Sequence, residues 1–279
     1  MSAKTSPMSE FQDLTSLLEP VNDGVSIALP PDYSGCAMSA VRALIERGIR
    51  RLEVLTVPQG GLQVDLLVGA GCVSSLESAA VTLGEYGLAP RFSEAVREGS
   101  VTMRESTCPA IHAGLQAAEK GLPFMPLRGI IGSDLVRYRP DWIIQDNPFS
   151  NNDPIVLLPA IRPDIALFHA PLADADGNVW VGVRRELMTM AHAAVTTLVT
   201  VEEISPDSLL LDEKTAAGVL PGIYVHGIAL VKNGAWPVGL WGSYAADEAH
   251  LAEYARCAKT SEGFRQYLAT HVYGSSAVS

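Results

Sequence analysis

The chain has 279 residues, with 31 acidic and 20 basic side chains and a formal net charge of -11. This acidity argues against a nucleic-acid-binding protein, because phosphate backbones are held by clustered lysine and arginine. Hydrophobic residues make up 48% and charged residues only 18%. These values exclude intrinsic disorder, and the low charge suggests that a partner covers part of the surface.

Targeting and redox signals indicate the class of protein. The most apolar run, Leu66–Val73, is shorter than the roughly 20 residues that a membrane-spanning helix needs. The first 13 residues have no apolar core of a signal peptide. The four cysteines form no CxxC pair, which argues against a zinc site and a disulfide framework. We therefore expect a reduced, cytoplasmic enzyme or enzyme subunit.

The first half of the chain alternates between strands and helices. Residues 1–10 are expected to form a loose leader, and Phe11–Leu18 a short helix. Apolar runs predict strands at Val25–Leu29, Leu52–Val57, Val64–Val68 and Val101–Arg104, and helical spacing predicts helices at Met38–Arg47, Arg91–Glu98 and Ala110–Lys120. Glycine follows each helix, where it commonly ends one. This order predicts right-handed crossovers and a mostly parallel sheet.

The second half begins with loops. Proline and glycine predict a loop over Leu122–Asp134 and a long surface loop at Pro140–Pro154. Further strands are predicted at Ile155–Leu158, Ile165–Ala170, Thr196–Val201 and Val225–Leu230, with helices at Leu187–Ala194 and Asp247–Tyr267. Asp176-Gly177 lies before the alternating run Val179–Val183, which favours a tight hairpin turn. We expect a leader and short helix in residues 1–19, and one α/β domain in residues 20–279 with an open, mostly parallel sheet flanked by helices.

Common catalytic motifs are absent from the sequence. It contains no GxxxxGK[ST], GxSxG or HExxH, and Gly69-x-Gly71 lacks the third glycine of a dinucleotide fingerprint. The six histidines show no metal-ligand spacing, so no metal is expected. Asp174–Asn178 opens like a calcium loop, but its glycine is at the fourth position instead of the sixth. The remaining candidates are Gly- and Pro-rich loops at strand ends, which form the ligand crevice in open α/β sheets.

Several segments resemble one family. They are Met38–Asp65, Asp65–Val73 (DLLVGAGCV), Gly121–Gly129 (GLPFMPLRG) followed by Gly132-Ser133-Asp134, Pro159–His169 (PAIRPDIALFH) followed by Asp174 and Gly177-Asn178-Val179, and Gly234–Pro237 with Tyr244 and Asp247. Over about residues 20–270 the chain resembles the α subunits of family I CoA-transferases, and it is most similar to the glutaconate CoA-transferase branch.

The resemblance implies a CoA-transferase-like fold and a β subunit of the same fold, in a heterodimer, heterotetramer or larger assembly. Acyl-CoA and a small or mid-sized carboxylic acid would be the substrates, with no tightly bound cofactor. In these transferases a β-subunit glutamate in a Glu-Asn-Gly-type motif attacks the acyl-CoA and then carries CoA as a thioester. This chain has no Glu-Asn-Gly, so it is not expected to transfer CoA alone.

Glu105 is the candidate catalytic carboxylate. It follows the predicted strand Val101–Arg104, at a strand end in the expected crevice. The chain also resembles α subunits of two-subunit hydrolases of bacterial steroid-ring degradation. That likeness implies a role for Glu105 as general base in carbon–carbon bond hydrolysis of a cyclic CoA thioester. The alternative is a carboxylate favoured by the dipole at the N-terminus of the next helix.

Other candidates are substrate-binding groups. Arg128 is expected to hold a substrate carboxylate or a CoA phosphate, or alternatively to form a structural salt bridge with Asp134. Ser133 and the Gly132 backbone are candidate donors to an acyl oxygen. Gly60, Gly61, Gly69 and Gly71 are candidates for close backbone approach to substrate, with ordinary turns as the alternative.

Structural roles are expected for four further residues. His169 and Asp164 are expected to be hydrogen-bond partners in or beside a buried strand, and Cys72 and Cys108 small buried residues. Leu29-Pro30-Pro31 stands where many family members have a glycine pair, and Arg104–Thr107 is an unusual version of its segment. The leading hypothesis is a CoA-transferase α subunit. The runner-up is a ring-opening hydrolase subunit, and a non-catalytic binding subunit is a third possibility.

Overall fold

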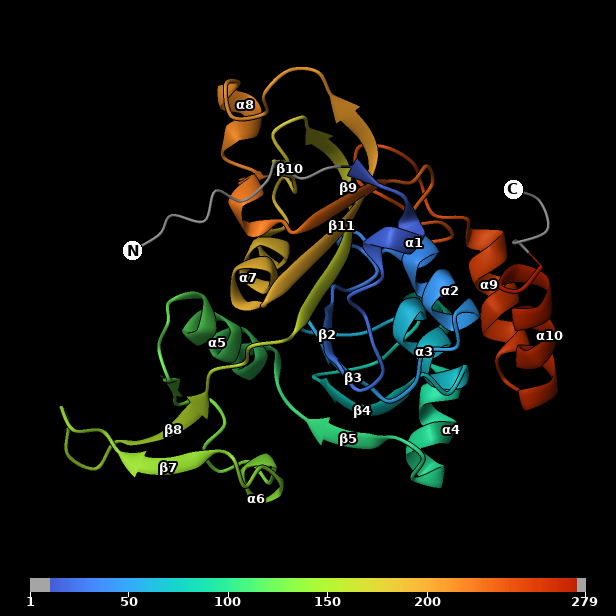
Figure 1. Cartoon of the computed structure of the whole chain (residues 1–279). Helices are drawn as coiled ribbons and strands as arrows, with labels where there is room; N and C mark the ends of the chain where they lie inside the picture. Colours follow the sequence, from blue (N-terminus) through green and yellow to red (C-terminus); the bar gives the residue numbers. More distant parts are fainter. Residues whose placement is uncertain (1–10, 275–279) are drawn as a thin grey trace.

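The computed structural model describes residues 11–274, so the leader expected over residues 1–10 lies outside the described residues. Eight strands of the main sheet lie in the order β1-β13-β11-β9-β2-β3-β4-β5 (Figure 1). Their bounds are β1 Phe11–Gln12, β2 Ser26–Leu29, β3 Leu52–Thr56, β4 Val73–Ser78, β5 Thr102–Glu105, β9 Ile165–Asp174, β11 Thr196–Ser205 and β13 Gly227–Leu230. All neighbours along this path pair in parallel. The open, mostly parallel sheet predicted from the sequence is confirmed.

Two short strands are added at the carboxyl end of β9, in the middle of this sheet. β10 (Val179–Trp180) pairs antiparallel with β9 and with β12 (Val219–Leu220). The Gly177 N–H donates to the Asp174 carbonyl at 3.0 Å, and Gly177 has φ +81°. The predicted hairpin after β9 is therefore confirmed, although the expected alternating run Val179–Val183 is a strand over only its first two residues.

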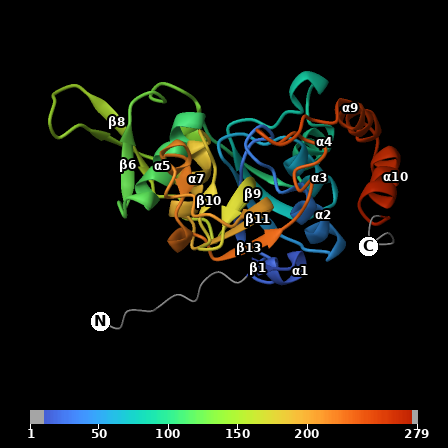
Figure 2. The same ribbon diagram turned by 90° about the horizontal axis from the view of Figure 1, so that it is seen from above.

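Helices cover both faces of the main sheet (Figure 2). One face carries α2 Met38–Glu46, α3 Leu62–Gly69, α4 Pro90–Glu98, α9 Glu248–Cys257 and α10 Ser261–His271, and the other carries α5 Cys108–Glu119 and α7 Arg185–Ala193. Neighbouring strand residues point to opposite faces. Thus Leu167 belongs to the core under α2 and α3, while Phe168 belongs to the core under α5 and α7.

A second, smaller sheet projects from the α5 side (Figure 1). It has the order β6-β8-β7 and is antiparallel, with β6 Phe124–Leu127, β7 Ile143–Asp146 and β8 Pro154–Pro159. The short helix α6 (Leu135–Tyr138) connects β6 to β7. Val156 and Leu158 pack with Trp142 and with Ala110 of α5, so the small sheet has its own core against α5.

The sequence wrongly predicts loops where this sheet forms. Loops are expected over Leu122–Asp134 and Pro140–Pro154, but these segments contain β6 and β7. Pro126 is compatible with a strand because β6 is an edge strand, where a missing N–H leaves no ladder bond unmade. Pairing with β8 is a contact between distant segments, which local composition does not reveal.

The predicted strand Val64–Val68 is also wrong, because this segment is the centre of α3. Every residue from Leu62 to Val68 is buried, so the helix lacks the polar face from which helical periodicity is read. A short apolar run of this kind is compatible with either a buried strand or a buried helix. The sequence also missed β4, the strand that follows this helix.

Smaller differences lie at the ends of the chain. The helix expected over Phe11–Leu18 is reduced to α1 (Leu14–Leu17), because Phe11–Gln12 pairs with β13 as β1. The long helix expected at Asp247–Tyr267 is two helices, α9 and α10, and Thr260 caps the second through its side chain. Two short 3-10 turns, Gly84–Tyr86 and Gly222–Tyr224, and the short helix α8 (Glu213–Ala216) complete the described elements. No described helix combines the length and apolar character needed to cross a membrane.

Candidate active site

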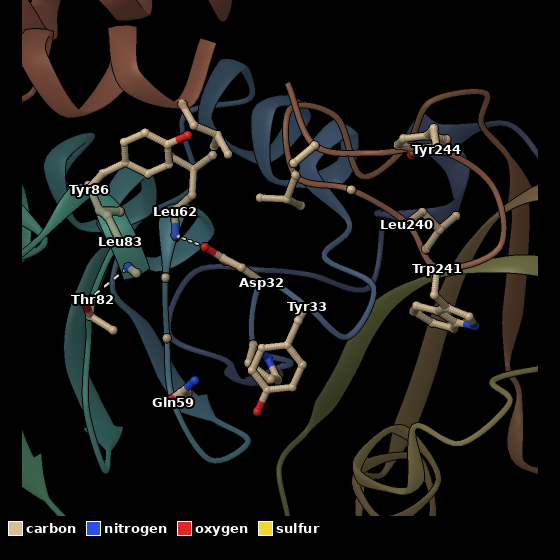
Figure 3. A pocket seen from close by; sticks show the side chains of 18 of the residues that line it. Asp32, Tyr33, Gln59, Leu62, Thr82, Leu83, Tyr86, Leu240, Trp241 and Tyr244 are labelled. Atoms are coloured by element: carbon tan, nitrogen blue, oxygen red, sulfur yellow. Dashed lines mark hydrogen bonds between the residues drawn. The ribbon is translucent and has the colours of Figure 1, made fainter. Parts of the chain in front are cut away.

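A cavity of about 590 Å³ lies beyond the carboxyl ends of β2, β3 and β4. Loops after these strands supply Tyr33, Gly60, Gly61 and Tyr86, and the segment 238–244 supplies the facing wall, which includes Trp241. Figure 3 shows Thr82, Leu83 and Tyr86 on one side and Leu240, Trp241 and Tyr244 on the other. The lining is mainly apolar and aromatic, which is typical of small-molecule sites.

Asp32 forms the junction between the β2 loop and α3. Its Oδ2 accepts a hydrogen bond from the Leu62 N–H at 2.9 Å, at the N-terminus of the helix (Figure 3). Burial raises the pKa of Asp32, against the lowering effect of the Leu62 N–H and the Cys36 thiol. A Cβ on Gly61 would lie 2.1 Å from Asp32 Oδ2, so glycine is needed there for the carboxylate to reach the helix.

Gly60 also lines the cavity, and a Cβ there would lie 2.7 Å from Val64 Cγ2. Gly60 and Gly61 therefore stand where the sequence placed them, at the end of a strand beside a crevice. Gly69 and Gly71 lie at the other end of α3, about 12 Å away along eight helical residues. A Cβ on Gly69 would meet Phe264 and Arg91, and Gly71 follows the helix with φ +71°. The structure thus separates this pair from the cavity.

A buried carboxylate, that of Glu202, holds the facing wall of the cavity and the residues 233–237 that lead into it. Glu202 accepts hydrogen bonds from the backbone N–H groups of residues 233 and 234 at 2.9 Å, and from the Tyr244 hydroxyl at 2.9 Å. His169 Nε2 lies 2.8 Å from the same carboxylate. Burial by itself would raise the pKa of Glu202, but these hydrogen bonds, led by His169, lower it to about 2. His169 is thus the hydrogen-bond partner that the sequence predicted.

Two buried donors at the cavity have no acceptor among the described residues. They are Arg184 Nε and Trp241 Nε1, and both residues line the cavity. The Arg184 guanidinium carbon lies 5.5 Å from the Trp241 ring centroid and 5.7 Å from that of Tyr33. Buried N–H groups are nearly always paired, so these two donors are exceptions, and in Figure 3 the Trp241 indole nitrogen lies on the side of its ring away from the cavity. The sequence analysis identified none of Tyr33, Arg184 and Trp241 as a candidate. Arg184 and Trp241 are 57 positions apart, and no local pattern links them.

Glu105 is the last residue of β5, at the edge of the main sheet, and it is exposed. Its carbonyl accepts a hydrogen bond from Arg139 Nη1 at 3.0 Å. Thr107 caps the following helix α5, accepting from the Ala110 N–H at 3.3 Å. The sequence therefore placed Glu105 correctly at a strand end before a helix, but in the structure it does not line the large cavity.

The arginine that holds Glu105 is at the centre of a charged network. Buried Arg139 pairs with Glu77 and with Asp141, each at 2.8 Å, and Arg104 lies 3.2 Å from the same Asp141. Burial acts to lower the pKa of Arg139, but its bonds to Asp141 and Glu77 raise it overall. These side chains line a hollow of about 190 Å³ between β5 and the small sheet. The hydroxyl of Ser106, which is buried in it, has no partner among the described residues.

Arg128, Gly132 and Ser133 all lie in the small-sheet unit, in the loop after β6. Arg128 forms a two-pronged ion pair with Asp153, with Nε–Oδ1 at 2.8 Å and Nη2–Oδ2 at 2.5 Å. Hydrogen bonds from Arg128, and then from Asn147, lower the pKa of Asp153 to about 2. The predicted salt bridge between Arg128 and Asp134 is wrong, because the Asp134 carboxylate lies 3.1 Å from Arg137 instead.

The loop around Ser133 is exposed. Ser133 Oγ accepts from the Leu135 N–H at 3.1 Å, and Gly132 has φ +85°. Arg128 keeps 66% of its side chain exposed, so its remaining donors face solvent. The candidate residues thus fall into four places: the cavity, the far end of α3 with Gly69 and Gly71, the end of β5 with its charged hollow, and the loop of the small sheet.

Two other residues from the sequence have clear surroundings. Asp164 Oδ2 accepts from the backbone N–H and the hydroxyl of Ser26 at 2.9 and 2.7 Å, a structural hydrogen bond as expected. Cys72 is buried, and burial raises its pKa to about 11. The expectation that Cys108 is buried is wrong, because it begins α5 at the surface.

Known proteins are similar to this chain in sequence and in fold. A family model described as coenzyme A transferase matches residues 15–230. The chain is 30% identical over 252 residues to a glutaconate CoA-transferase subunit of Acidaminococcus fermentans, covering 84% of this chain and 78% of that one. The crystal structure of that organism's glutaconate coenzyme A-transferase superposes with a TM-score of 0.86 at 27% identity, covering 95% of this chain and 89% of that chain.

A relative of different named activity matches equally well. The chain is 31% identical over 247 residues to the cholesterol ring-cleaving hydrolase IpdA subunit of Rhodococcus jostii, covering 85% of this chain and 83% of that one. It is also 32% identical over 242 residues to an uncharacterized protein of Archaeoglobus fulgidus. That match covers 85% of this chain but only 53% of the longer relative. By sequence, by fold and by the arrangement of its strands, the chain belongs to the coenzyme A transferase family.

Proposed function

We propose that this chain is the α subunit of a heteromeric CoA-transferase that moves CoA between an acyl-CoA and a carboxylic acid. The observation that carries the proposal is a large cavity at the carboxyl ends of β2–β4, within the fold of this family. No Glu-Asn-Gly segment is present in the chain. The carboxylate that accepts CoA as a thioester therefore comes from a partner subunit, and this chain supplies the binding surface.

The residues of the cavity have distinct roles in this proposal. Its apolar and aromatic walls bury the acyl group, because removing apolar surface from water is favourable. The Arg184 guanidinium, which lies in the lining beside Tyr33 and Trp241, donates to a carbonyl or carboxylate oxygen of the bound molecule. The backbone at Gly60 and Gly61 allows close approach to the substrate. Arg128, Gly132 and Ser133 contact the CoA or the acid from the small sheet, beside the partner.

The partner is proposed to be a β subunit of the same fold, in a heterodimer or heterotetramer. Large apolar side chains are exposed across the small-sheet unit, at Leu122, Phe124, Tyr138, Ile143, Ile144 and Phe149. Exposed apolar groups gathered in one region are typical of an interface. The location is proposed to be the cytoplasm, because all four cysteines are free in the structure.

Co-expression tests the transferase proposal. The chain is produced with and without a candidate β subunit that contains a Glu-Asn-Gly motif, and transfer of CoA from acyl-CoA to free acids is followed by mass spectrometry. We expect transfer by the complex and none by either chain alone. Transfer by the isolated chain would refute the assignment as one subunit of a larger enzyme.

Glu105 supports a second candidate, a hydrolase subunit that opens the ring of a cyclic CoA thioester. The specific observation is its exposed position at the end of β5, with its backbone held by buried Arg139. Its carboxylate would take a proton from water, and the resulting hydroxide would add to a ring ketone before the carbon–carbon bond breaks.

The hydrolase candidate is tested by Glu105→Gln in the assembled complex. Gln keeps the size of the side chain but cannot act as a base, so hydrolysis should fall by about 100-fold or more. Glu98→Gln, at the exposed end of α4, is the matched control. Full activity of Glu105→Gln toward both transfer and hydrolysis would remove Glu105 from catalysis.

A further inference from the structure

Two histidines and a glutamate meet where α9 packs against α10. His250 and Glu253 are about one turn apart on α9, and His271 is the last residue of α10. One candidate ligand atom from each side chain lies within 4.8 Å of the others. Glu253 Oε1 is 3.3 Å from His271 Nε2, and Glu253 Oε2 is 3.9 Å from His250 Nδ1. The carboxylate therefore lies within 4 Å of one nitrogen of each ring, and the two rings meet edge to face with centroids 4.7 Å apart.

The ring of His250 is held in a defined orientation. Its Nε2 lies 2.7 Å from the Tyr267 hydroxyl, and its ring packs on Trp236 with centroids 4.3 Å apart. When Nε2 carries the proton and donates it to Tyr267, Nδ1 presents a lone pair toward Glu253. Metal-binding histidines almost always have such a partner on the second nitrogen, because it sets the tautomer and the ring orientation.

We propose that His250, Glu253 and His271 bind a divalent transition-metal ion, with zinc as the favoured ion. Two imidazole nitrogens and one carboxylate oxygen are a donor set that suits zinc. Tetrahedral bonds of about 2.0–2.1 Å bring ligand atoms to about 3.4 Å from one another. The side chains reach this spacing by small rotations, mainly of Glu253, which has 39% of its side chain exposed. That exposure also provides the entry path.

The surrounding charges are compatible with a cation. Glu253 supplies one negative charge as a ligand, and Asp247 lies near His250. Arg42 is also near and opposes the cation, but its guanidinium is directed to the Trp236 carbonyl at 3.0 Å and to that residue's ring. The other two ligands are neutral imidazoles, so a bound divalent ion would leave the site with a net positive charge, and the site is partly open to water.

The proposed ion would tie α9 to α10. α9 also contributes Leu251 and Tyr254 to the wall of the large cavity. Fixing α9 against α10 would therefore fix that wall, so metal binding stabilises the site without taking part in its chemistry. His250 and Glu253 have the spacing H-x-x-E, but the third ligand lies 18 positions further along the next helix. No sequence spacing of histidines predicts that arrangement.

Metal titration of the protein without a histidine tag tests the proposal. After treatment with EDTA, ZnSO₄ is titrated by calorimetry, and CoCl₂ is added in parallel to record the visible spectrum. We expect about one ion per chain, with the absorption of tetrahedral cobalt bound to imidazole. Because loss of an outer-shell partner alone costs about 10–100-fold in affinity, His271→Ala and Glu253→Gln should each weaken zinc binding by at least about tenfold.

His192→Asn is the matched control, because His192 also faces a glutamate, Glu119, at 3.4 Å, but no third ligand joins them within residues 11–274. It should leave zinc affinity unchanged. Tyr267→Phe keeps all three ligands and should weaken binding by less than His271→Ala does. The absence of tight zinc binding or of a tetrahedral cobalt spectrum in the wild-type protein would overturn the proposal, as would wild-type affinity in His271→Ala. The cobalt spectrum decides the question even if a variant does not fold.

Discussion

At the scale of residues, the backbone of Glu105 is positioned by Arg139, which is 34 positions away in the sequence. Arg139 reaches from the small-sheet unit to the Glu105 carbonyl and is held there by Glu77 and Asp141. Its side chain is only 5% exposed and its guanidinium lies 4.4 Å from the Trp142 ring centroid. A buried charge of this kind is stable only while its partners remain, so the end of β5 depends on the small sheet.

Arg139→Met should therefore destabilise the protein by about 3 kcal/mol, because it leaves Glu77 and Asp141 partly unpaired in a buried site. Urea unfolding followed by circular dichroism measures this loss. Arg137→Met is the matched control, since its ion pair with Asp134 is more than 80% exposed on the arginine side and should be worth less than about 1 kcal/mol. Equal losses in the two variants would contradict the assignment.

Arg128 offers a second prediction at this scale, concerning binding instead of stability. If Arg128 contacts substrate, Arg128→Ala in the assembled enzyme should raise KM for the acyl-CoA by about tenfold or more, which corresponds to one hydrogen bond to a charged group. Asp153→Asn keeps the guanidinium and weakens only its ion pair, so KM should change much less. A similar effect of both variants would assign Arg128 a purely structural role.

At the scale of elements, α3 is the helix that connects the cavity to the outer layer of helices. Its first turn meets Asp32, and Asp65 in its interior accepts hydrogen bonds from the Phe92 N–H of α4 and the Tyr254 hydroxyl of α9, both at 2.7 Å. Burial raises the pKa of Asp65 to about 6, although both hydrogen bonds act to lower it. One buried carboxyl group therefore links three helices and titrates near neutral pH.

This link predicts a pH dependence of stability. The folded state holds the Asp65 proton more tightly than the unfolded state, in which the pKa is about 4. The contribution of Asp65 to stability is therefore fully present below about pH 4 and is lost as the pH rises through about 6, by up to about 3 kcal/mol. Asp65→Asn stays neutral and can keep both contacts, so this part of the pH dependence should disappear.

Free energies of unfolding measured in urea at pH 4 and pH 7.5 test the effect. The difference between the two values should be smaller for Asp65→Asn than for the wild-type protein. Asp207→Asn, whose side chain is exposed, is the control and should behave like wild type. An unchanged pH dependence in Asp65→Asn would show that the carboxylate is ionised over the whole range in the folded protein.

At the scale of the whole molecule, the low charge of the chain is consistent with a covered surface. The apolar side chains of the small-sheet unit are exposed, with Phe149 at 95% and Ile143 at 59%. This unit projects beside the end of β5 (Figure 1), so a partner bound there would complete the region that contains Glu105 and Arg128.

Phe149→Glu and Ile143→Glu should each weaken the heteromer by about tenfold or more, because a charge would be buried against the partner. Sedimentation of the co-expressed chains measures the assembly. Leu211→Glu is the control. Leu211 is 86% exposed, which is similar to Phe149, but it lies in the distant segment before α8, so this variant should leave assembly intact. Normal assembly of all three variants would place the interface on another face.

The sequence predicted much of the main sheet because its signals are local. Apolar runs located β2, β3, β5, β9, β11 and β13, and glycines ended α2, α4 and α5, each with positive φ after the helix. The same local logic placed Gly60, Gly61 and Glu105 at strand ends. It failed for α3, because a helix buried on every side has no periodic polar face to reveal it.

The amino-acid sequence by itself determined the class of fold, the resemblance to the coenzyme A transferases and the absence of a Glu-Asn-Gly segment, because each is written in contiguous residues. Only the tertiary structure decided which side chains share a site. It separated Gly69 from Gly61, paired Arg128 with Asp153, placed Arg184 beside Trp241 and gathered His250 with His271. These contacts join residues far apart in the chain, and packing between layers, instead of local preference, brings them together.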